Sequence, residues 1–154
     1  MTVSKQERLK DRKEARKGRP RSKLNPSNDK KKLIAELDTL WRKIINIKWG
    51  HRCAVCRGAG TQAHHFFGKK ACPSTRWNTD NGVLLCFYDH IGRVHQQGLV
   101  EPVRDKLLEK LGPTDFEDLK FEAFRVHKFT TEELYALKQE LTDELFELVD
   151  QGEV

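Results

Sequence analysis

Residues 53–95 read CAVCRGAGTQAHHFFGKKACPSTRWNTDNGVLLCFYDHIGRVH, and this stretch decides how the chain of 154 residues folds. It contains all four cysteines and four of the six histidines of the chain. Thiolate sulfur and imidazole nitrogen are ligands that zinc and other transition metals favour. We therefore expect the stretch to fold around metal ions, with the flanking segments holding it in shape.

The cysteines predict a structural zinc site. Cys53 and Cys56 have the C-x-x-C spacing of a zinc knuckle, in which a tight turn lets two thiolates hold one tetrahedral ion. Cys86 supplies a third ligand, and either Asp89 or Cys72 supplies the fourth. Two alternatives stay open: a disulfide, which a reducing compartment disfavours, and reduced cysteines that are buried as small apolar residues without zinc.

The histidines predict a second, catalytic metal site. Neighbouring residues on a strand point to opposite sides, so His64 can face a metal ion while His65 faces substrate. His90 is expected on a following helix as a second ligand, and His95 is a further candidate from the same helix. His65 would then act as the general base, oriented by the side-chain carbonyl of Asn81.

This arrangement suits hydrolysis of a phosphodiester by one base and one divalent ion. Imidazole ligands fit Mn, Ni or Zn better than Mg, although all four ions are candidates. Lys69, Lys70 and Arg76 lie between the two halves of the histidine motif and are candidates for DNA binding through phosphate oxygens. The alternative for these three residues is a merely solvated surface.

The order His-His, Asn, His, framed by cysteines, resembles the HNH (ββα-metal) endonuclease family. The likeness is carried by AHHFFGKK (63–70), RWNTDNGVLLC (76–86) and DHIGRVH (89–95), and it covers about residues 51–97. Together with a Leu-rich segment opened by HKFTTEEL (127–134), the chain is similar to phage NinG-type recombination nucleases, more weakly and to about residue 145.

The resemblance implies an HNH endonuclease that cuts DNA during phage recombination or DNA processing, in the cytoplasm of a bacterial host. It assigns the base role to His65, the metal roles to His64 and His90, and the orienting role to Asn81. The chain departs from the family pattern in two places. Asp89 stands where a cysteine is frequent, and four residues separate His90 from His95 where three are common.

Charge is divided unevenly along the chain. Residues 1–32 contain 13 Lys and Arg against 4 Asp and Glu, whereas residues 33–154 contain 16 against 19. We expect residues 1–32 to be a disordered basic arm that binds DNA phosphates without sequence specificity. A solubilising tail or a localisation signal is the alternative for this segment.

The predicted fold class is α+β, with a small ββα-metal core and zinc knuckle packed among several α-helices. Residues 33–154 form one nuclease domain, with a helix over 33–49, the core over 51–97 and C-terminal helices over 100–150. Asp29 and Asp89 are expected to cap helices, Thr130 and Glu133 to form a capping box, and residues 69–81 to form a surface loop. His127 is expected at a surface or helix junction.

The hydropathy of the chain excludes a membrane-spanning protein. Two functions other than a nuclease stay open. No segment approaches the roughly 18 apolar residues that span a bilayer, so we expect a cytoplasmic protein with no membrane partner. The oligomeric state stays open, a dimer included. The rivals to a nuclease are a non-catalytic zinc-bound DNA-binding module and a phage interaction protein with a decayed nuclease fold.

Overall fold

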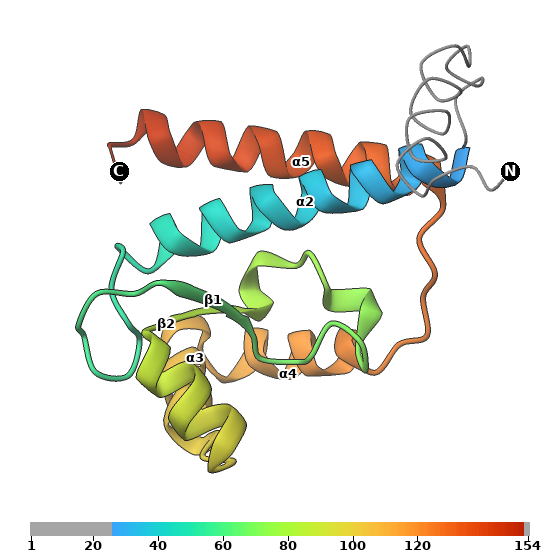
Figure 1. The fold of residues 1–154 in the computed structure, drawn as a ribbon. Coiled ribbons are helices and arrows are strands. Elements are labelled where there is room, and N and C mark those ends of the chain that lie inside the picture. The colour runs from blue at the N-terminus through green and yellow to red at the C-terminus, as the bar shows by residue number, and fades with distance from the viewer. Residues whose placement is uncertain (1–25, 153–154) are drawn as a thin grey trace, which may run out of the picture. The chain divides into compact units, whose positions relative to one another are not determined.

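A computed structural model describes residues 26–152, and Figure 1 shows its elements. The chain divides at Lys32–Leu33 into two compact units, and every site described below lies in the second unit. The predicted disordered arm falls mainly on residues 1–25, which lie outside the described residues, and it is wrong for residues 26–32, which are helical. In chain order the elements are α2 (Pro26–Lys48), β1 (Gln62–His65), the 3₁₀-helices η1 (Pro73–Thr75) and η2 (Thr79–Asn81), β2 (Gly82–Leu85), the π-helix η3 (Tyr88–Gln96), α3 (Glu101–Leu111), α4 (Pro113–Ala123) and α5 (Thr131–Asp150).

Two long helices, α2 and α5, lie side by side and enclose the first hydrophobic core (Figure 1). Leu37, Trp41 and Ile45 recur at helical spacing on α2, so they face the same side and are buried. Leu134 and Leu141 of α5 pack against them. The predicted capping box begins α5, with the Glu133 amide donating to Thr130 Oγ1 at 3.2 Å and the Thr130 amide to the Glu133 carboxylate at 2.7 Å.

The two strands form an antiparallel hairpin, with Ala63 opposite Leu84 and His64 opposite Val83. All four residues of β2 are buried because the strand lies between two cores. Leu84 joins the core of α2 and α5, whereas its neighbours Val83 and Leu85 join a second core. Gly82 sits so close to Ile45 that a Cβ atom at this position would collide with it.

The second core is closed by α3 and α4, which contribute Val103, Leu107, Phe116 and Leu119. Gly112 ends α3 with a φ of 82°, a left-handed conformation that glycine adopts without strain. Pro113 then starts α4, where its fixed φ suits the first helical position.

The predicted mixture of helices with a small two-stranded antiparallel sheet is confirmed, and local details differ. Because α2 begins at Pro26, Asp29 lies in its first turn, so its predicted role as the cap is wrong. Residues 69–81 are not simply a surface loop, since Cys72, Thr75 and Trp77 are buried. No helix within residues 26–152 is both long and apolar enough to cross a membrane.

Candidate active site and metal centre

A knuckle follows α2 and carries the C-x-x-C pair. The Cys53 amide donates to the Gly58 carbonyl at 2.8 Å, and the Arg57 amide donates back to the Cys53 carbonyl at 3.0 Å. Arg57 takes a left-handed φ of 63°, which closes the turn. The Ala54 amide donates to the Leu84 carbonyl at 2.8 Å, so the knuckle is fixed directly to β2.

Three cysteines and one aspartate converge beside this knuckle. The ligand atoms of Cys53, Cys56, Cys86 and Asp89 all lie within 4.8 Å of one another. The sulfurs of Cys56 and Cys86 are 3.7 Å apart, and Asp89 Oδ2 lies 3.1 Å from the Cys53 sulfur and 3.3 Å from the Cys86 sulfur. With Zn–S near 2.3 Å and Zn–O near 2.0 Å, a tetrahedral zinc site has S–S edges of about 3.8 Å and S–O edges of about 3.5 Å. The four side chains therefore match the dimensions of a zinc site and could hold an ion.

Asp89 is the unusual member of this cluster. Its side chain is buried, and one carboxylate oxygen, Oδ1, lies 3.1 Å from Arg93 Nη1. Burial raises the pKa of Asp89, but hydrogen bonds from Cys53 and the other two thiols, together with the Arg93 charge, outweigh burial and hold that pKa below its usual value. The carboxylate is thus ionised and suited to a metal. The predicted capping role of Asp89 is wrong, because η3 begins after Phe87 without a side-chain cap.

Cys72 was the rival fourth ligand, and the structure does not bring it to the other cysteines. It lies at the start of η1, buried, with its amide donating to the Gly68 carbonyl at 2.9 Å. All four cysteines are free thiols, which removes the disulfide alternative. Asp89 is therefore the fourth member of the cluster.

Three of the predicted histidines also converge. The ligand nitrogens of His64, His90 and His95 lie within 4.8 Å of one another, and the Nε2 atoms of His90 and His95 are 3.1 Å apart. Two nitrogens bound to one ion at about 2.05 Å would be about 2.9–3.4 Å apart. Burial, followed by the charges of His90, His95 and His65, lowers the pKa of His64 to about 4, and burial also lowers that of His90. Imidazole nitrogens so close together suit a shared cation.

The π-helix explains why His95 joins this group despite its spacing. In an α-helix of 3.6 residues per turn, residues five apart point in different directions. In a π-helix each turn is closed by an i to i+5 hydrogen bond, so residues five apart lie much nearer to the same side of the helix. The Gln97 amide, for example, donates to the Gly92 carbonyl at 3.2 Å. The extra residue between His90 and His95 is absorbed by the wider helix.

His65 faces away from this cluster and contacts α2. Its ring stacks on Trp41 with centroids 3.8 Å apart and planes inclined by 7°. Its Nε2 lies 2.8 Å from the Arg76 carbonyl oxygen, which can only accept a hydrogen bond. Nε2 therefore carries the proton and Nδ1 has the lone pair. Burial lowers the pKa of His65 despite that hydrogen bond, so the ring is a neutral base.

The Arg76 carbonyl is itself held by an ion pair that the sequence did not indicate. Arg76 Nε and Nη2 donate to the two carboxylate oxygens of Asp38 at 3.1 and 2.8 Å, and Trp77 Nε1 donates to Asp38 at 2.8 Å. The Arg76 guanidinium is thus paired with Asp38, and its role in binding phosphate stays a prediction. The one signal in the sequence was Asp38 itself, an acid three residues before Trp41 on a mainly apolar helix face.

Asn81 is buried and does not contact His65. Its side-chain oxygen accepts from the Phe67 amide at 2.7 Å, while its side-chain nitrogen donates to the Phe67 carbonyl at 2.9 Å and the Thr75 carbonyl at 3.1 Å. The prediction that its side-chain carbonyl orients His65 is therefore wrong. Asn81 instead fixes the backbone that follows His65, and the Arg76 carbonyl sets the tautomer.

Two of the predicted DNA-binding residues, Lys69 and Lys70, are exposed after the turn at Gly68. Lys69 is close enough for its charge to lower the pKa of both Asp38 and His65. It therefore adds positive charge near the predicted base. His127 lies between α4 and α5, with Nε2 3.4 Å from a Glu133 carboxylate oxygen, and is not part of either cluster.

No family model, no curated protein and no solved structure matches this chain. The donor atoms of the two clusters therefore indicate the chemistry of the site. A four-donor cluster rich in sulfur suits a structural ion, and a three-histidine cluster leaves room for water or substrate at an ion. His65 follows directly after one of these histidines.

Proposed function

We propose that this chain is a metal-dependent HNH-type endonuclease that hydrolyses phosphodiester bonds in DNA. One observation carries the proposal: the ligand nitrogens of three histidines converge, and the residue after His64 in the strand is a histidine whose Nε2 is bonded to the Arg76 carbonyl, which leaves Nδ1 as its basic nitrogen. Hydrolysis of a phosphodiester needs both a cation for developing negative charge and a base for the attacking water.

Each residue has a distinct task in this proposal. His64, His90 and His95 would hold the divalent ion, and an ion there supplies positive charge for the phosphate oxygens and the leaving 3′ oxygen. His65 Nδ1 takes a proton from the water whose oxygen bonds to phosphorus as the bond from phosphorus to the 3′ oxygen breaks. Asn81 positions the backbone after His65, and Lys69 attracts the phosphate.

Support for the second metal is independent of catalysis. Cys53, Cys56, Cys86 and Asp89 have the donor chemistry and spacing of a structural zinc site. Zinc held there would join the knuckle to the start of η3, the helix that carries His90 and His95.

The finer assignment, a phage recombination nuclease of the NinG type, rests on the sequence resemblance and is part of the proposal. The basic residues 1–32 would add affinity for DNA without choosing a sequence. A panel of labelled duplex, single-stranded and four-way-junction substrates would identify the form of DNA that is cut.

Metal-dependent nicking of supercoiled plasmid tests the proposal. The full chain should nick plasmid when Mn²⁺, Ni²⁺, Zn²⁺ or Mg²⁺ is added, and His65→Ala should lower the rate by about 10²–10⁴ because the base is lost. His127→Ala is the matched control, since His127 lies outside both clusters.

Equal rates for His65→Ala and the unchanged chain would reject His65 as the catalytic base. A chain that binds DNA with zinc in place but never cuts any substrate would instead favour a non-catalytic DNA-binding module.

A further inference from the structure

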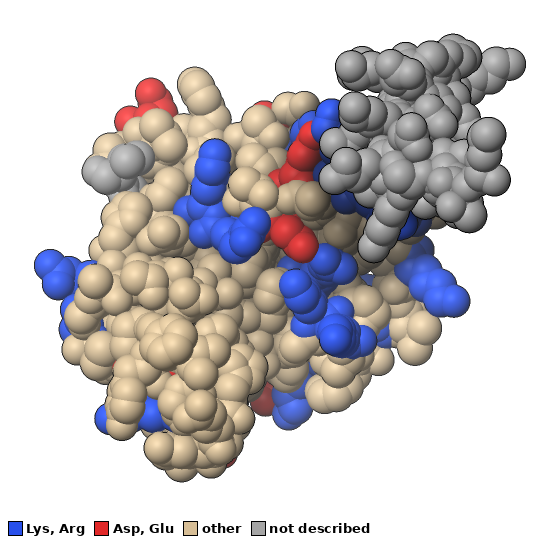
Figure 2. Space-filling model, viewed as in Figure 1, with Lys and Arg blue, Asp and Glu red and all other residues tan. Residues whose placement is uncertain are grey.

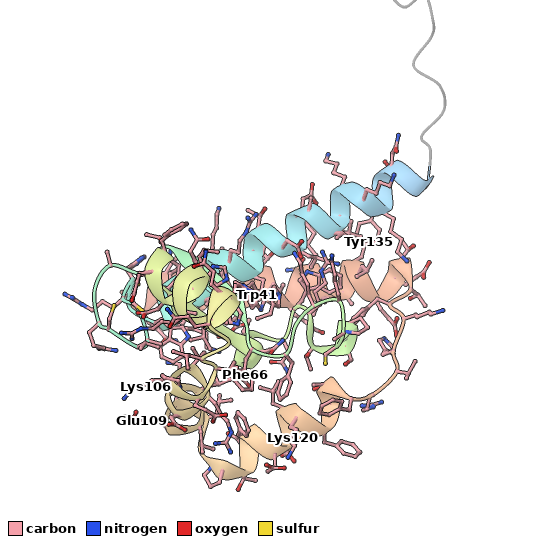
Figure 3. The ribbon with its side chains drawn as sticks, turned by 60° about the horizontal axis from the view of Figure 1, so that its bottom comes forward. Trp41, Phe66, Lys106, Glu109, Lys120 and Tyr135 are labelled. Carbon is pink, nitrogen blue, oxygen red and sulfur yellow. The ribbon has the colours of Figure 1, made fainter. Side chains whose placement is uncertain are left out.

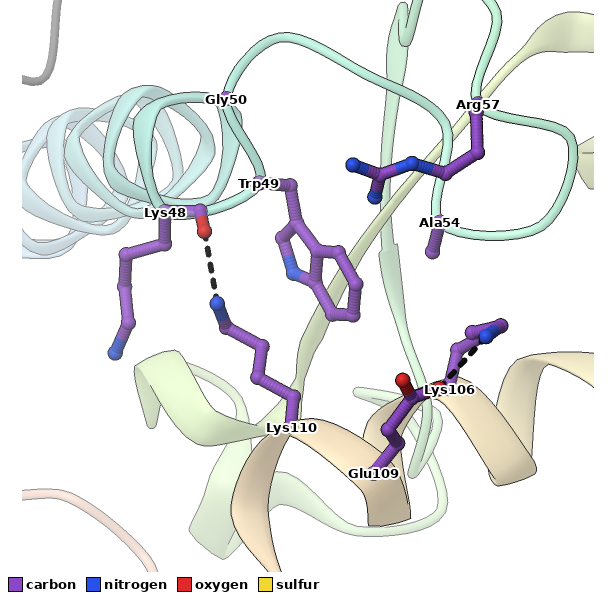
Figure 4. Close-up of a pocket in the computed structure, with 8 residues that line it drawn as sticks. All are labelled: Lys48, Trp49, Gly50, Ala54, Arg57, Lys106, Glu109 and Lys110. Atoms are coloured by element: carbon purple, nitrogen blue, oxygen red, sulfur yellow. Dashed lines mark hydrogen bonds and ion pairs between the residues drawn. The ribbon is translucent and has the colours of Figure 1, made fainter.

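A pocket unrelated to the histidines opens beside the zinc knuckle (Figure 4). Its volume is about 620 Å³. Trp49 at the end of α2 and Arg57 of the knuckle line one side, and Lys106, Glu109 and Lys110 of α3 line the other (Figure 4). None of these residues belongs to the two ligand clusters.

The charge of this pocket is opposite to that of the folded unit around it. Residues 33–154 contain more acidic than basic side chains, whereas the pocket wall gathers Arg57, Lys106 and Lys110 around the single carboxylate of Glu109. On the face that Figure 2 shows, Lys and Arg gather in several groups. In the pocket the basic side chains outnumber the acidic one.

Two of the basic groups, Lys106 and Lys110, are held in place before any ligand arrives. Lys110 Nζ donates to the carbonyl of Lys48, the last residue of α2, at 2.9 Å and lies 4.9 Å from the centroid of the Trp49 ring. Lys106 Nζ lies 2.6 Å from a Glu109 carboxylate oxygen, and Figure 3 shows both side chains projecting from α3. Hydrogen bonding and charge from Lys106, followed by the charge of Arg57, lower the pKa of Glu109. Arg57 thus lies near enough to act on the same anion as Lys106.

The exposure of the pocket indicates which kind of phosphate ligand it can bind. A site for a small nucleotide encloses its ligand and fixes it with a few buried polar groups. Here Arg57, Glu109 and Lys110 are exposed, and the covered part is the indole of Trp49 and the side chain of Ala54. Exposed Lys and Arg around an open hollow are what a nucleic acid backbone requires.

We propose that this pocket binds backbone phosphates of the DNA strand on which the chain acts, and so forms a second DNA contact next to the zinc knuckle. The inference rests on the proposed function, which supplies DNA as the substrate. The pocket is inferred to bind DNA and not to cleave it.

Anisotropy of a labelled duplex tests it, with the zinc-loaded full chain carrying His65→Ala to prevent cleavage. Arg57→Gln with Lys106→Gln should lower the association constant about 10-fold and make the salt slope shallower by about 1.8, since each lost phosphate contact removes about 0.9. Gln keeps the Cβ atom at Arg57, so the left-handed turn is no more strained than before. The matched control is Lys120→Gln with Arg125→Gln, because Lys120 also pairs with a glutamate three residues away.

A second variant should act in the opposite direction. Glu109→Gln removes the one acidic group of the pocket and should raise the association constant about 2-fold to 5-fold, whereas Glu117→Gln, its counterpart beside Lys120, should change nothing. A gain of affinity cannot come from damage to the fold.

If the association constant fell equally in the pocket variant and in the Lys120 control, only net charge would matter for binding. That result would overturn the inference. So would a mononucleotide that binds the unchanged chain, fails to bind the pocket variant and leaves duplex binding intact, because the pocket would then serve a small ligand. Absence of metal-dependent cleavage by the unchanged chain would reject the nuclease without affecting these binding results.

Discussion

The cysteine cluster and the histidine cluster are served by the same π-helix, yet they differ in how closed they are. Asp89 and His90 are adjacent in η3, and the first joins the cysteines while the second joins the histidines. The cysteine cluster has four donors, of which Cys53 and Asp89 are fully buried and Cys56 is exposed. The histidine cluster has three donors, none fully buried, and His95 is exposed. Closed four-donor sites are structural, whereas a site with an open position can bind water or substrate.

The comparison shows that one short helix can place two adjacent residues, Asp89 and His90, in two clusters with different sets of donor atoms. An ion in the cysteine cluster would fix where η3 starts, and the start of η3 decides where His90 and His95 point. Changes in the first cluster should therefore affect the whole site, and changes in the second should affect only its chemistry.

The largest effect is expected at the cysteines. Cys53→Ser should lose zinc and much of the fold, because binding energy at a structural zinc site, about 10 kcal/mol or more, is also folding energy. Cys72→Ser should keep zinc, since that buried thiol lies outside the cluster. Metal analysis and circular dichroism of the two variants measure the contrast, and zinc loss from Cys72→Ser alone would reverse the assignment.

The next largest effect is expected from variants that separate the role of His64 from that of His65. His65→Ala should lower the cleavage rate about 10²–10⁴-fold with metal and DNA binding nearly intact. His64→Ala should also be inactive, but through weaker binding of the catalytic ion, so excess metal should partly restore it. Isothermal titration with Mn²⁺ and single-turnover cleavage separate the two cases. If His65→Ala lost the ion and His64→Ala kept it, the roles would have to be exchanged.

A smaller effect tests the π-helix. His95→Ala should weaken binding of the catalytic ion about 10-fold or more, because one of three ligands is removed. Gln96→Ala, one residue further along the exposed side of η3, is the control and should have no effect. In an α-helix His95 would point away from His90, so normal ion affinity in His95→Ala would argue against the π-helix in solution.

The smallest effect concerns pH. Burial lowers the pKa of His65 from its usual 6.5, so the folded protein keeps the base neutral at pH values where a solvated histidine is protonated. The acid midpoint of the cleavage rate at saturating metal should therefore lie below pH 6.5. A rate–pH profile with its acid midpoint at or above 6.5 would contradict a buried base.

Local spacing was enough to predict the members of both clusters. Cys53 and Cys56 indicated the knuckle, and His64, His90 and His95 were named as ligands from their order and a strand–helix alternation. Spacing did not decide which residue is the fourth member of the cysteine cluster. Asp89 and Cys72 were equal in the sequence, and only the path of η1 takes Cys72 to a different part of the fold.

The rest depended on contacts between distant segments. The Asp38–Arg76 pair joins residues 38 positions apart, and it decides that the Arg76 carbonyl, and not Asn81, orients His65. The choice between an α-helix and a π-helix is likewise invisible in YDHIGRVHQ, because the two differ by one residue per turn. It follows from the need to present Asp89 to one cluster and both histidines to the other.

The strand β2 has a consequence for how the protein unfolds. Leu84 on one face and Val83 with Leu85 on the other belong to different cores, so neither core can open without exposing the same four-residue strand. Unfolding of the unit should then be a single cooperative transition, with the amides of β2 among the last to exchange with solvent. Loss of the ion at the knuckle, whose Ala54 amide is bonded to Leu84, would be transmitted to α2 and α5 through this strand.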